Sequence, residues 1–323
     1  MKKFRPLIII AGLIAALVGG YFMLNSMLFD GISPQHIETD GFQANIFSPK
    51  KSNSKAAVVI LGGGQFGDYW GQSLAKKGYT GLSLPYHRKP GLPDLPEEIP
   101  LEYFQKAIAW LTKQTAVDAD KIVVMGASRN AELALLVAST FPDAVAGAIA
   151  YAPGSASWSN TVLPFNSDEL KPSWTFQGKP VPYIAMNKIQ GGDSDRISLL
   201  DYWRNGLADS AQYSTGHIPV ERIKGPILLL SGLDDQVWPA AEMSDLIEAK
   251  LKAYNFQHRV DNIQYEDAGH LISGNPDFLN PERDGQMTVN GRNYRYNFGG
   301  TSEGDQKAQQ DARARVFEFM NQL

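Results

Sequence analysis

A serine, an aspartate and a histidine each follow a short apolar run, and together they have the residue types of a proton relay. Ser128 stands in the motif G-A-S, and a helix-forming stretch follows it. Asp235 and His270 follow two later apolar runs. A serine hydroxyl becomes a nucleophile for acyl transfer when an imidazole takes its proton and a carboxylate orients that imidazole. The three residues therefore predict a catalytic triad.

The nucleophile motif departs from G-x-S-x-G at one position, where Asn130 replaces the second glycine. Between a strand and a helix, such a serine occupies a sharp turn that exposes its hydroxyl above the positive end of the helix dipole. The alternative is that Ser128 only caps the helix. Asp234 is likewise an alternative to Asp235, and both can cap the helix that begins near Pro239.

The positions of the histidines indicate which of them could take part in catalysis and whether a metal site is expected. Of five histidines, only His270 lies at a strand end after the acid, whereas His87 follows an earlier strand and is expected to line the substrate pocket. No pair of histidines has the spacing of metal ligands, so no metal site is predicted. No cofactor is predicted either.

A run of three glycines, residues 62–64, ends the first long apolar segment. Glycines let the main chain approach a substrate, and this turn is where one oxyanion donor is expected in such sites. The N–H groups of Gly64 or Gln65, with that of Arg129, are the predicted donors. A phosphate cradle is the alternative, but the run lacks the Lys-Ser/Thr pair of a P-loop.

Apolar runs and helical spacing alternate along the chain, which is typical of parallel sheets covered by helices on both faces. We expect one doubly wound, mostly parallel α/β domain over residues 30–323, with its site at the carboxyl ends of the strands. Residues 154–222 break the alternation and predict an inserted cap. Its Trp158 and Trp174 are expected to bind the apolar part of a substrate, although core packing explains them equally well. The predicted strands are 42–47, 58–61, 80–84, 122–125, 145–150, 227–230 and 263–265, and the main helices are 101–113, 240–254 and 307–320.

Composition excludes several classes of protein. The chain has 323 residues, a formal net charge of −4 and no cysteine. Disulfides, thiolate metal sites and cysteine nucleophiles are therefore absent. Charges of both signs are dispersed, and nucleic-acid binding, which needs a clustered basic face, is not expected.

The N-terminal segment is basic and then apolar. Lys2, Lys3 and Arg5 precede residues 7–24, which are almost wholly apolar. About 20 apolar residues span a bilayer as a helix, and the basic flank stays in the cytoplasm. The pattern predicts that residues 1–29 anchor the chain in a membrane, with an extracytoplasmic catalytic domain in the periplasm or at the cell surface. A cleaved signal peptide and a buried N-terminal helix are the alternatives.

Several longer motifs point to one family. They are I-P-L-E-Y-F at 99–104, G-A-S-R-N-A-E-L-A-L at 126–135, W-T-F-Q-G at 174–178, I-P-V-E-R-I-K-G-P at 218–226 and A-G-H-L-I at 268–272. With these motifs, the chain resembles the C-terminal catalytic domain of the acyl-CoA thioester hydrolases and bile acid-CoA:amino acid N-acyltransferases. Ser128, Asp235 and His270 fall on the family's triad positions.

The resemblance implies an α/β-hydrolase fold, in which the triad follows the chain order Ser, Asp, His. It also implies a serine hydrolase that cleaves small-molecule acyl thioesters or carboxylesters. A serine peptidase-like hydrolase, and a membrane-anchored binding protein of impaired activity, are the alternatives.

Overall fold

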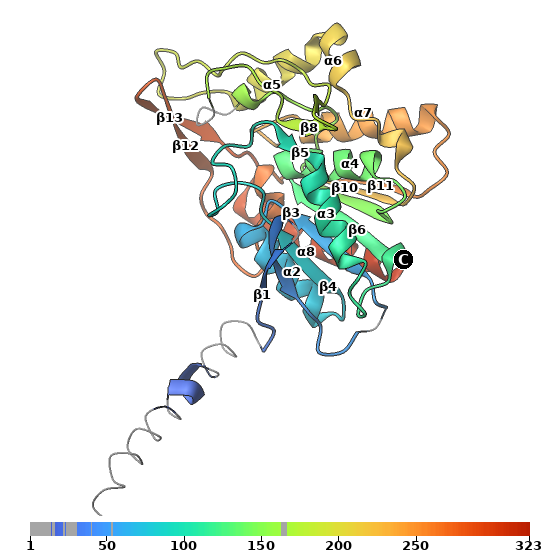
Figure 1. Cartoon of the computed structure of the whole chain (residues 1–323). Coiled ribbons are helices and arrows are strands. Elements are labelled where there is room, and N and C mark those ends of the chain that lie inside the picture. Colours follow the sequence, from blue (N-terminus) through green and yellow to red (C-terminus); the bar gives the residue numbers. More distant parts are fainter. Residues whose placement is uncertain are drawn as a thin grey trace, which may run out of the picture.

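The chain folds around a central sheet (Figure 1). The structure, a computed structural model, describes residues 31–323 apart from 40, 53 and 163–166, together with 14, 17–21 and 23 near the N-terminus. In this part of the chain, the sheet has the strand order β1-β2-β4-β3-β6-β7-β10-β11. Its strands are β1 (Gln35–Thr39), β2 (Phe42–Phe47), β3 (Ala57–Leu61), β4 (Thr80–Leu84), β6 (Ile122–Ala127), β7 (Gly147–Tyr151), β10 (Ile227–Gly232) and β11 (Val260–Tyr265).

The sheet is parallel from β4 to β11, whereas β1 and β2 pair antiparallel at one edge. The central strands are runs of apolar residues that are buried on both faces, as parallel strands under two helical layers must be. In β3, Val59 faces one core, and Val58 faces the other. The doubly wound α/β architecture is thereby confirmed.

Helices cover both faces of the sheet. Helices α2 (Gly64–Lys76) and α8 (Ser302–Asn321) lie on one face. Helices α3 (Leu101–Leu111), α4 (Arg129–Thr140) and α7 (Ala240–Ala253) contribute to the core on the other. Short 3₁₀ turns occur at Ala119–Lys121, Asn160–Val162, Val220–Arg222 and His270–Ser273. The chain turns after the carboxyl ends of β6, β10 and β11, and the predicted triad residues lie in these three turns.

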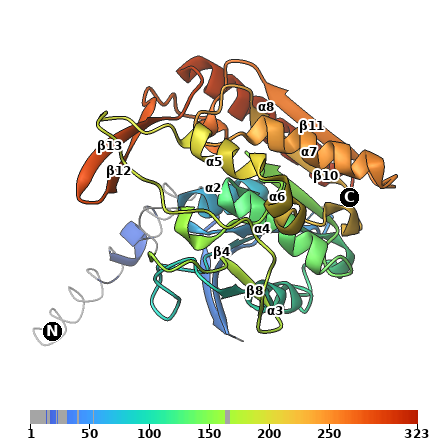
Figure 2. The same cartoon turned by 90° about the horizontal axis from the view of Figure 1, so that it is seen from above.

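The segment between β7 and β10 leaves the sheet and returns to it. It contains β8 (Trp174–Phe176), β9 (Lys179–Pro180), α5 (Leu199–Ala208) and α6 (Ser210–Gly216). Strand β8 also pairs with β5 (Ile99–Pro100), which precedes α3. Figure 1 shows α5 and α6 above the sheet, and Figure 2, seen from above, shows them across the middle of the molecule between α7 and α4. The predicted cap region, residues 154–222, corresponds to this segment, which is called the insert below.

A hairpin of β12 (Asp284–Val289) and β13 (Arg292–Asn297) projects from the segment after β11 (Figure 1). It is held to the insert by main-chain hydrogen bonds: Ile197 N–H donates to Arg295 O over 2.9 Å, and Arg295 N–H donates to Asp195 O over 2.8 Å. The sequence predicts only an irregular stretch at 274–300, because two short polar strands carry no apolar alternation.

The predicted membrane localisation is contradicted. Among the described residues, no helix combines the length and the apolar character that crossing a bilayer requires. The longest of the folded domain's described helices, α8, has 20 residues but carries acidic and basic side chains along its length. The predicted anchor at residues 1–29 lies mostly outside the described residues.

Candidate active site

The turn that carries Ser128 has a strained main chain. Ser128 joins β6 to α4 with φ 58° and ψ −125°, a conformation that is rare for a residue with a side chain. Its N–H is held by Tyr151 O of the neighbouring strand at 2.8 Å. Gly126 permits the turn, because a Cβ there would lie 1.9 Å from Asn130 O. Backbone strain of this kind is found at functional sites, where the surrounding structure enforces it.

Asn130 fits this turn without distortion. It lies within α4 and is not among the residues with positive φ, so the helix does not need glycine there. Its Oδ1 accepts a hydrogen bond from the buried Tyr86 hydroxyl at 2.9 Å. Its side chain also covers Gly62, where a Cβ would meet Asn130 Nδ2 at 2.3 Å. The asparagine thus connects the Ser128 turn to the glycine run.

A buried carboxylate orients the histidine. Asp235 is 5% exposed, and its Oδ2 lies 2.8 Å from His270 Nδ1. Its Oδ1 accepts the N–H groups of Val237 at 2.8 Å and Trp238 at 3.1 Å. With both oxygens engaged, the carboxylate has a fixed direction, and Nδ1 carries the proton that it donates.

The neighbouring carboxylate, that of Asp234, has different hydrogen-bond partners. Asp234 Oδ2 accepts the N–H of Gly300 at 2.9 Å, and its Oδ1 accepts Gln236 Nε2 at 2.8 Å. It fastens the acid loop to the chain that enters α8. Of the two aspartates that the sequence leaves open, Asp235 is the one that contacts His270.

The three predicted triad residues lie at the carboxyl ends of strands in the parallel part of the sheet. Ser128, Asp235 and His270 follow β6, β10 and β11, which run parallel within the order β6-β7-β10-β11. Within the part of the chain that the structure describes, the Ser128 hydroxyl forms no hydrogen bond and is partly exposed. Its contact with the imidazole therefore stays a prediction.

The predicted oxyanion donors lie in the first turns of two helices. Gly64 and Gln65 begin α2 and are exposed, and Arg129 begins α4. The N–H groups of a first helical turn have no partner within the helix, so they are available to an anion. Asn130, packed over Gly62, brings the two helix starts together. Their role as donors stays a prediction.

The predicted substrate-binding residues differ in accessibility. His87 follows β4, is partly buried and packs against Tyr86, with ring centroids 4.9 Å apart and ring planes inclined at 54°. Burial, with a contribution from Arg88, lowers the pKa of His87. Trp158 and Trp174 are almost fully enclosed, at 0% and 1% exposed. Their surroundings are those of packed side chains, and substrate contact by all three residues stays a prediction.

Sequence reasoning did not single out two buried acids that support the site. Glu132 in α4 is fully buried, and burial raises the pKa of its carboxyl although the Arg129 guanidinium opposes the shift. Asp305 in α8 accepts the N–H of Gly269, next to His270, at 2.7 Å. The sequence signal for Glu132 is its position as the one charged residue in the otherwise apolar helical stretch 131–135.

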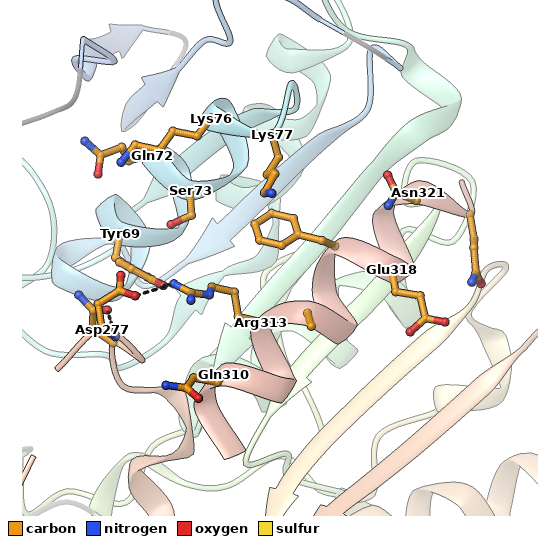
Figure 3. A pocket seen from close by; sticks show the side chains of 14 residues that line it. Tyr69, Gln72, Ser73, Lys76, Lys77, Asp277, Gln310, Arg313, Glu318 and Asn321 are labelled. Carbon is orange, nitrogen blue, oxygen red and sulfur yellow. Dashed lines mark hydrogen bonds and ion pairs between the residues drawn. The ribbon is translucent and has the colours of Figure 1, made fainter. Parts of the chain in front are cut away.

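A separate surface pocket of about 770 Å³ lies between α2 and α8 (Figure 3). Arg313 of α8 crosses it and contacts the Tyr69 hydroxyl at 3.2 Å and Asp277 at 2.9 Å. None of the residues that the sequence predicts for the site lines this pocket. In the described part of the chain, no group of three acidic, histidine or cysteine side chains could hold a metal.

A comparison with known families identifies the family of this chain. The family model described as BAAT / Acyl-CoA thioester hydrolase C terminal matches residues 99–323, more than half of the chain. The chain belongs to this family. The membership that the sequence motifs imply is therefore confirmed, and the family's matched region includes Ser128, Asp235 and His270.

Curated relatives are acyl-CoA thioesterases. The chain is 25% identical over 295 residues to acyl-coenzyme A thioesterase 6 of Homo sapiens, covering 90% of this chain and 65% of that protein. It is 27% identical over 297 residues to acyl-coenzyme A thioesterase 1 of Mus musculus, covering 91% and 66%. The chain thus spans about half to two thirds of the length of the relatives it matches.

Solved structures share the fold. A puromycin-hydrolysing peptidase of Mycobacterium tuberculosis superposes with a TM-score of 0.54 at 15% identity, over 90% of this chain and 39% of that one. An acylaminoacyl peptidase of Pyrococcus horikoshii gives the same TM-score and identity, over 92% and 43%. At this identity the likeness shows the fold alone, and the predicted α/β-hydrolase fold is confirmed.

Proposed function

We propose that this family member hydrolyses acyl thioesters, and related carboxylesters, through a covalent acyl intermediate on Ser128. The observation that carries the proposal is the 2.8 Å contact between the buried Asp235 carboxylate and His270 Nδ1. With Nδ1 bound to this carboxylate, Nε2 is the basic nitrogen of an oriented imidazole. The imidazole and the strained Ser128 turn both lie at the carboxyl ends of the parallel strands. The names of the relatives supply the substrate class.

The proposed chemistry has two steps. His270 takes the proton of the Ser128 hydroxyl while the oxygen attacks the acyl carbon, and the thiol or alcohol leaves with that proton. In the second step, water gives a proton to His270 while its oxygen attacks the acyl carbon. The bond between the acyl carbon and Ser128 Oγ then breaks, His270 returns the proton to Oγ, and the free acid leaves. N–H groups at the starts of α2 and α4 hold the oxyanion in both steps.

The alternative of an impaired binding protein loses its support. That alternative rested on Asn130 in place of the second motif glycine. Since residue 130 is helical and its side chain is hydrogen-bonded, the substitution does not distort the turn. No observation favours a peptidase over an esterase, and substrate preference separates these two.

The test combines a fluorophosphonate probe, which labels activated serines, with matched thioester, ester and amide substrates. The wild-type chain should be labelled and should release free thiol from at least one member of a panel of acyl-CoA substrates. Ser128→Ala should lose labelling and at least about 10³-fold in kcat. Ser73→Ala, a serine in α2 beside the separate pocket, should retain both.

Two outcomes would contradict the proposal. A folded wild-type chain that takes no label and turns over no ester would remove the enzymatic interpretation. Amide cleavage faster than thioester and ester cleavage would instead identify a peptidase.

A further inference from the structure

Glu132 is a buried carboxylate directly behind the proposed nucleophile. It lies one helical turn after Ser128 in α4, and its N–H donates to Ser128 O at 3.2 Å. Its side chain is 0% exposed. A carboxylate in such surroundings is costly unless charged and polar groups surround it, so its partners define what it does.

Those partners are Arg129 and the insert. Glu132 Oε2 pairs with Arg129 Nη1 at 2.5 Å. Glu132 Oε1 accepts the main-chain N–H of Trp158 at 3.3 Å and the indole N–H of Trp174 at 2.9 Å. Arg129 Nη2 in turn donates to Ser173 Oγ at 2.6 Å and to Trp158 O at 3.4 Å. Both members of the pair therefore bind the insert on either side of residues 163–166.

The contacts continue from the insert to the histidine. The Trp158 ring packs edge-on against Trp203 of α5, with centroids 4.9 Å apart. Trp203 packs against Trp238 at 5.4 Å, and Trp238 against the His270 ring at 6.3 Å. Hydrogen bonds to the Trp158 main chain and then a series of packed rings thus join the start of α4 to the imidazole.

We propose that Glu132 is a positioning residue, which acts through Arg129 to hold the insert in one orientation over the Ser128 turn. Arg129 also follows the nucleophile, and its main-chain N–H is the proposed oxyanion donor, so the ion pair restrains a residue that belongs to the proposed site. The inference rests on the proposed function, because it concerns the geometry of that same site.

The orientation of these groups is the reason for assigning this role. Desolvation cancels most of the attraction within a buried ion pair, so such a pair is weak evidence for stability. Its hydrogen bonds nevertheless have strict directions, and here they join one helix to two separate stretches of the insert. A loss of orientation lowers the rate of the chemical step more than it weakens substrate binding.

The experiment uses Glu132→Gln in the full chain. Glutamine keeps the size of the side chain and its Oε1 acceptor, but it removes the charge that Arg129 pairs with. Fluorophosphonate titration counts the reactive Ser128 sites, so that kcat is expressed per site. We expect kcat per titrated site to fall at least tenfold with KM within threefold, and labelling to slow in parallel.

Two further variants sharpen the result. Arg129→Lys keeps the positive charge but loses the forked hydrogen bonds, and it should show a smaller loss of kcat in the same direction. Glu242→Gln makes the same chemical change in α7, where Glu242 pairs with Arg204 of α5 and so also joins the insert to the body of the protein. That pair is exposed, and its loss should change kcat by less than twofold.

The outcomes separate the two proposals. If wild type is active and folded Glu132→Gln keeps wild-type kcat per titrated site, the positioning role is overturned and the proposed function stands. If Glu132→Gln does not fold, Arg129→Lys decides, and an unchanged kcat in that folded variant overturns the role equally. An unlabelled, inactive wild type would overturn both proposals.

Discussion

Adjacent residues of the same type can have unrelated tasks, as Asp234 and Asp235 show. The side chain of Asp235 is directed inward to the imidazole, and that of Asp234 is directed to the main chain of Gly300. The difference is set by the loop conformation after β10, where Gln236 N–H is held by Phe298 O. The same Phe298 O accepts the N–H of His270, so one carbonyl aligns the acid and histidine loops.

This contrast predicts the effect of removing one charge. Asp235→Asn should lower kcat by about 10⁴-fold, because an amide that donates to Nδ1 selects the wrong imidazole tautomer. The matched change Asp234→Asn should lower kcat by less than tenfold. Initial rates of thioester hydrolysis, with folding checked by circular dichroism, measure both. Equal losses in the two variants would refute the assignment of the acid.

At the scale of elements, the insert is fastened at several points of its length. One of them is Glu97, in the segment after β4, whose Oε1 accepts the Ser167 N–H at 2.8 Å, the Ser167 hydroxyl at 2.6 Å and Asn160 Nδ2 at 2.9 Å. Burial alone would raise the pKa of Glu97, but the hydrogen bonds from Ser167 and Asn160 outweigh it and lower that pKa.

The lowered pKa gives a pH-dependent stabilisation with a definite sign. The folded chain binds the Glu97 proton less tightly than the unfolded chain does, so the stabilisation is complete above the unfolded pKa of about 4.3. It is lost as the pH falls through the folded pKa. Glu97→Gln should therefore lower Tm by about 2 °C at pH 7, and the difference from wild type should shrink below about pH 4.

Scanning calorimetry from pH 3.5 to 7 tests this prediction. The control is Glu98→Gln, which alters an exposed carboxylate 3.8 Å from Lys171 and should shift Tm by less than about 1 °C. A Tm difference between Glu97→Gln and wild type that stays constant at all pH values would contradict it.

At the scale of the whole molecule, the C-terminal helix α8 contacts the main chain on both sides of His270. Asp305 in α8 is 2% exposed, pairs with Arg283 at 2.5 Å and accepts the N–H of Gly269 beside the histidine. Gln309, one turn later, donates to Leu271 O at 2.7 Å. The C-terminal helix is therefore needed for the position of His270 as well as for the core.

Asp305→Ala should destabilise the fold by about 3 kcal/mol, because it removes the carboxylate that pairs with the partly buried Arg283. It should also lower kcat, since the chain before His270 loses its hydrogen bond. Urea unfolding and thioester hydrolysis measure the two effects. Glu303→Ala, in the exposed first turn of α8, should cost less than about 1 kcal/mol. A similar cost for the two variants would show that α8 does not act through Asp305.

The sequence by itself determined the central strands of the sheet, the helices that cover them and the residues at the strand ends, but not the edge strand β1 or the helices α5 and α6 of the insert. Buried parallel strands such as β3 and β10 are continuous apolar runs, and turns such as the one at Gly126 need small residues, so both leave a local pattern. The chain order of Ser128, Asp235 and His270 is equally local information, and the resemblance to the family supported it.

Only the tertiary structure decided the rest. The strands β5, β8, β12 and β13 are too short or too polar to show a period, and they exist because distant segments supply their hydrogen bonds. The choice of Asp235 over Asp234, and the burial of Glu132 between α4 and the insert, likewise depend on contacts between residues far apart in sequence. Spacing along a chain cannot specify which groups a fold brings within 3 Å, and that distance determines what a carboxylate does.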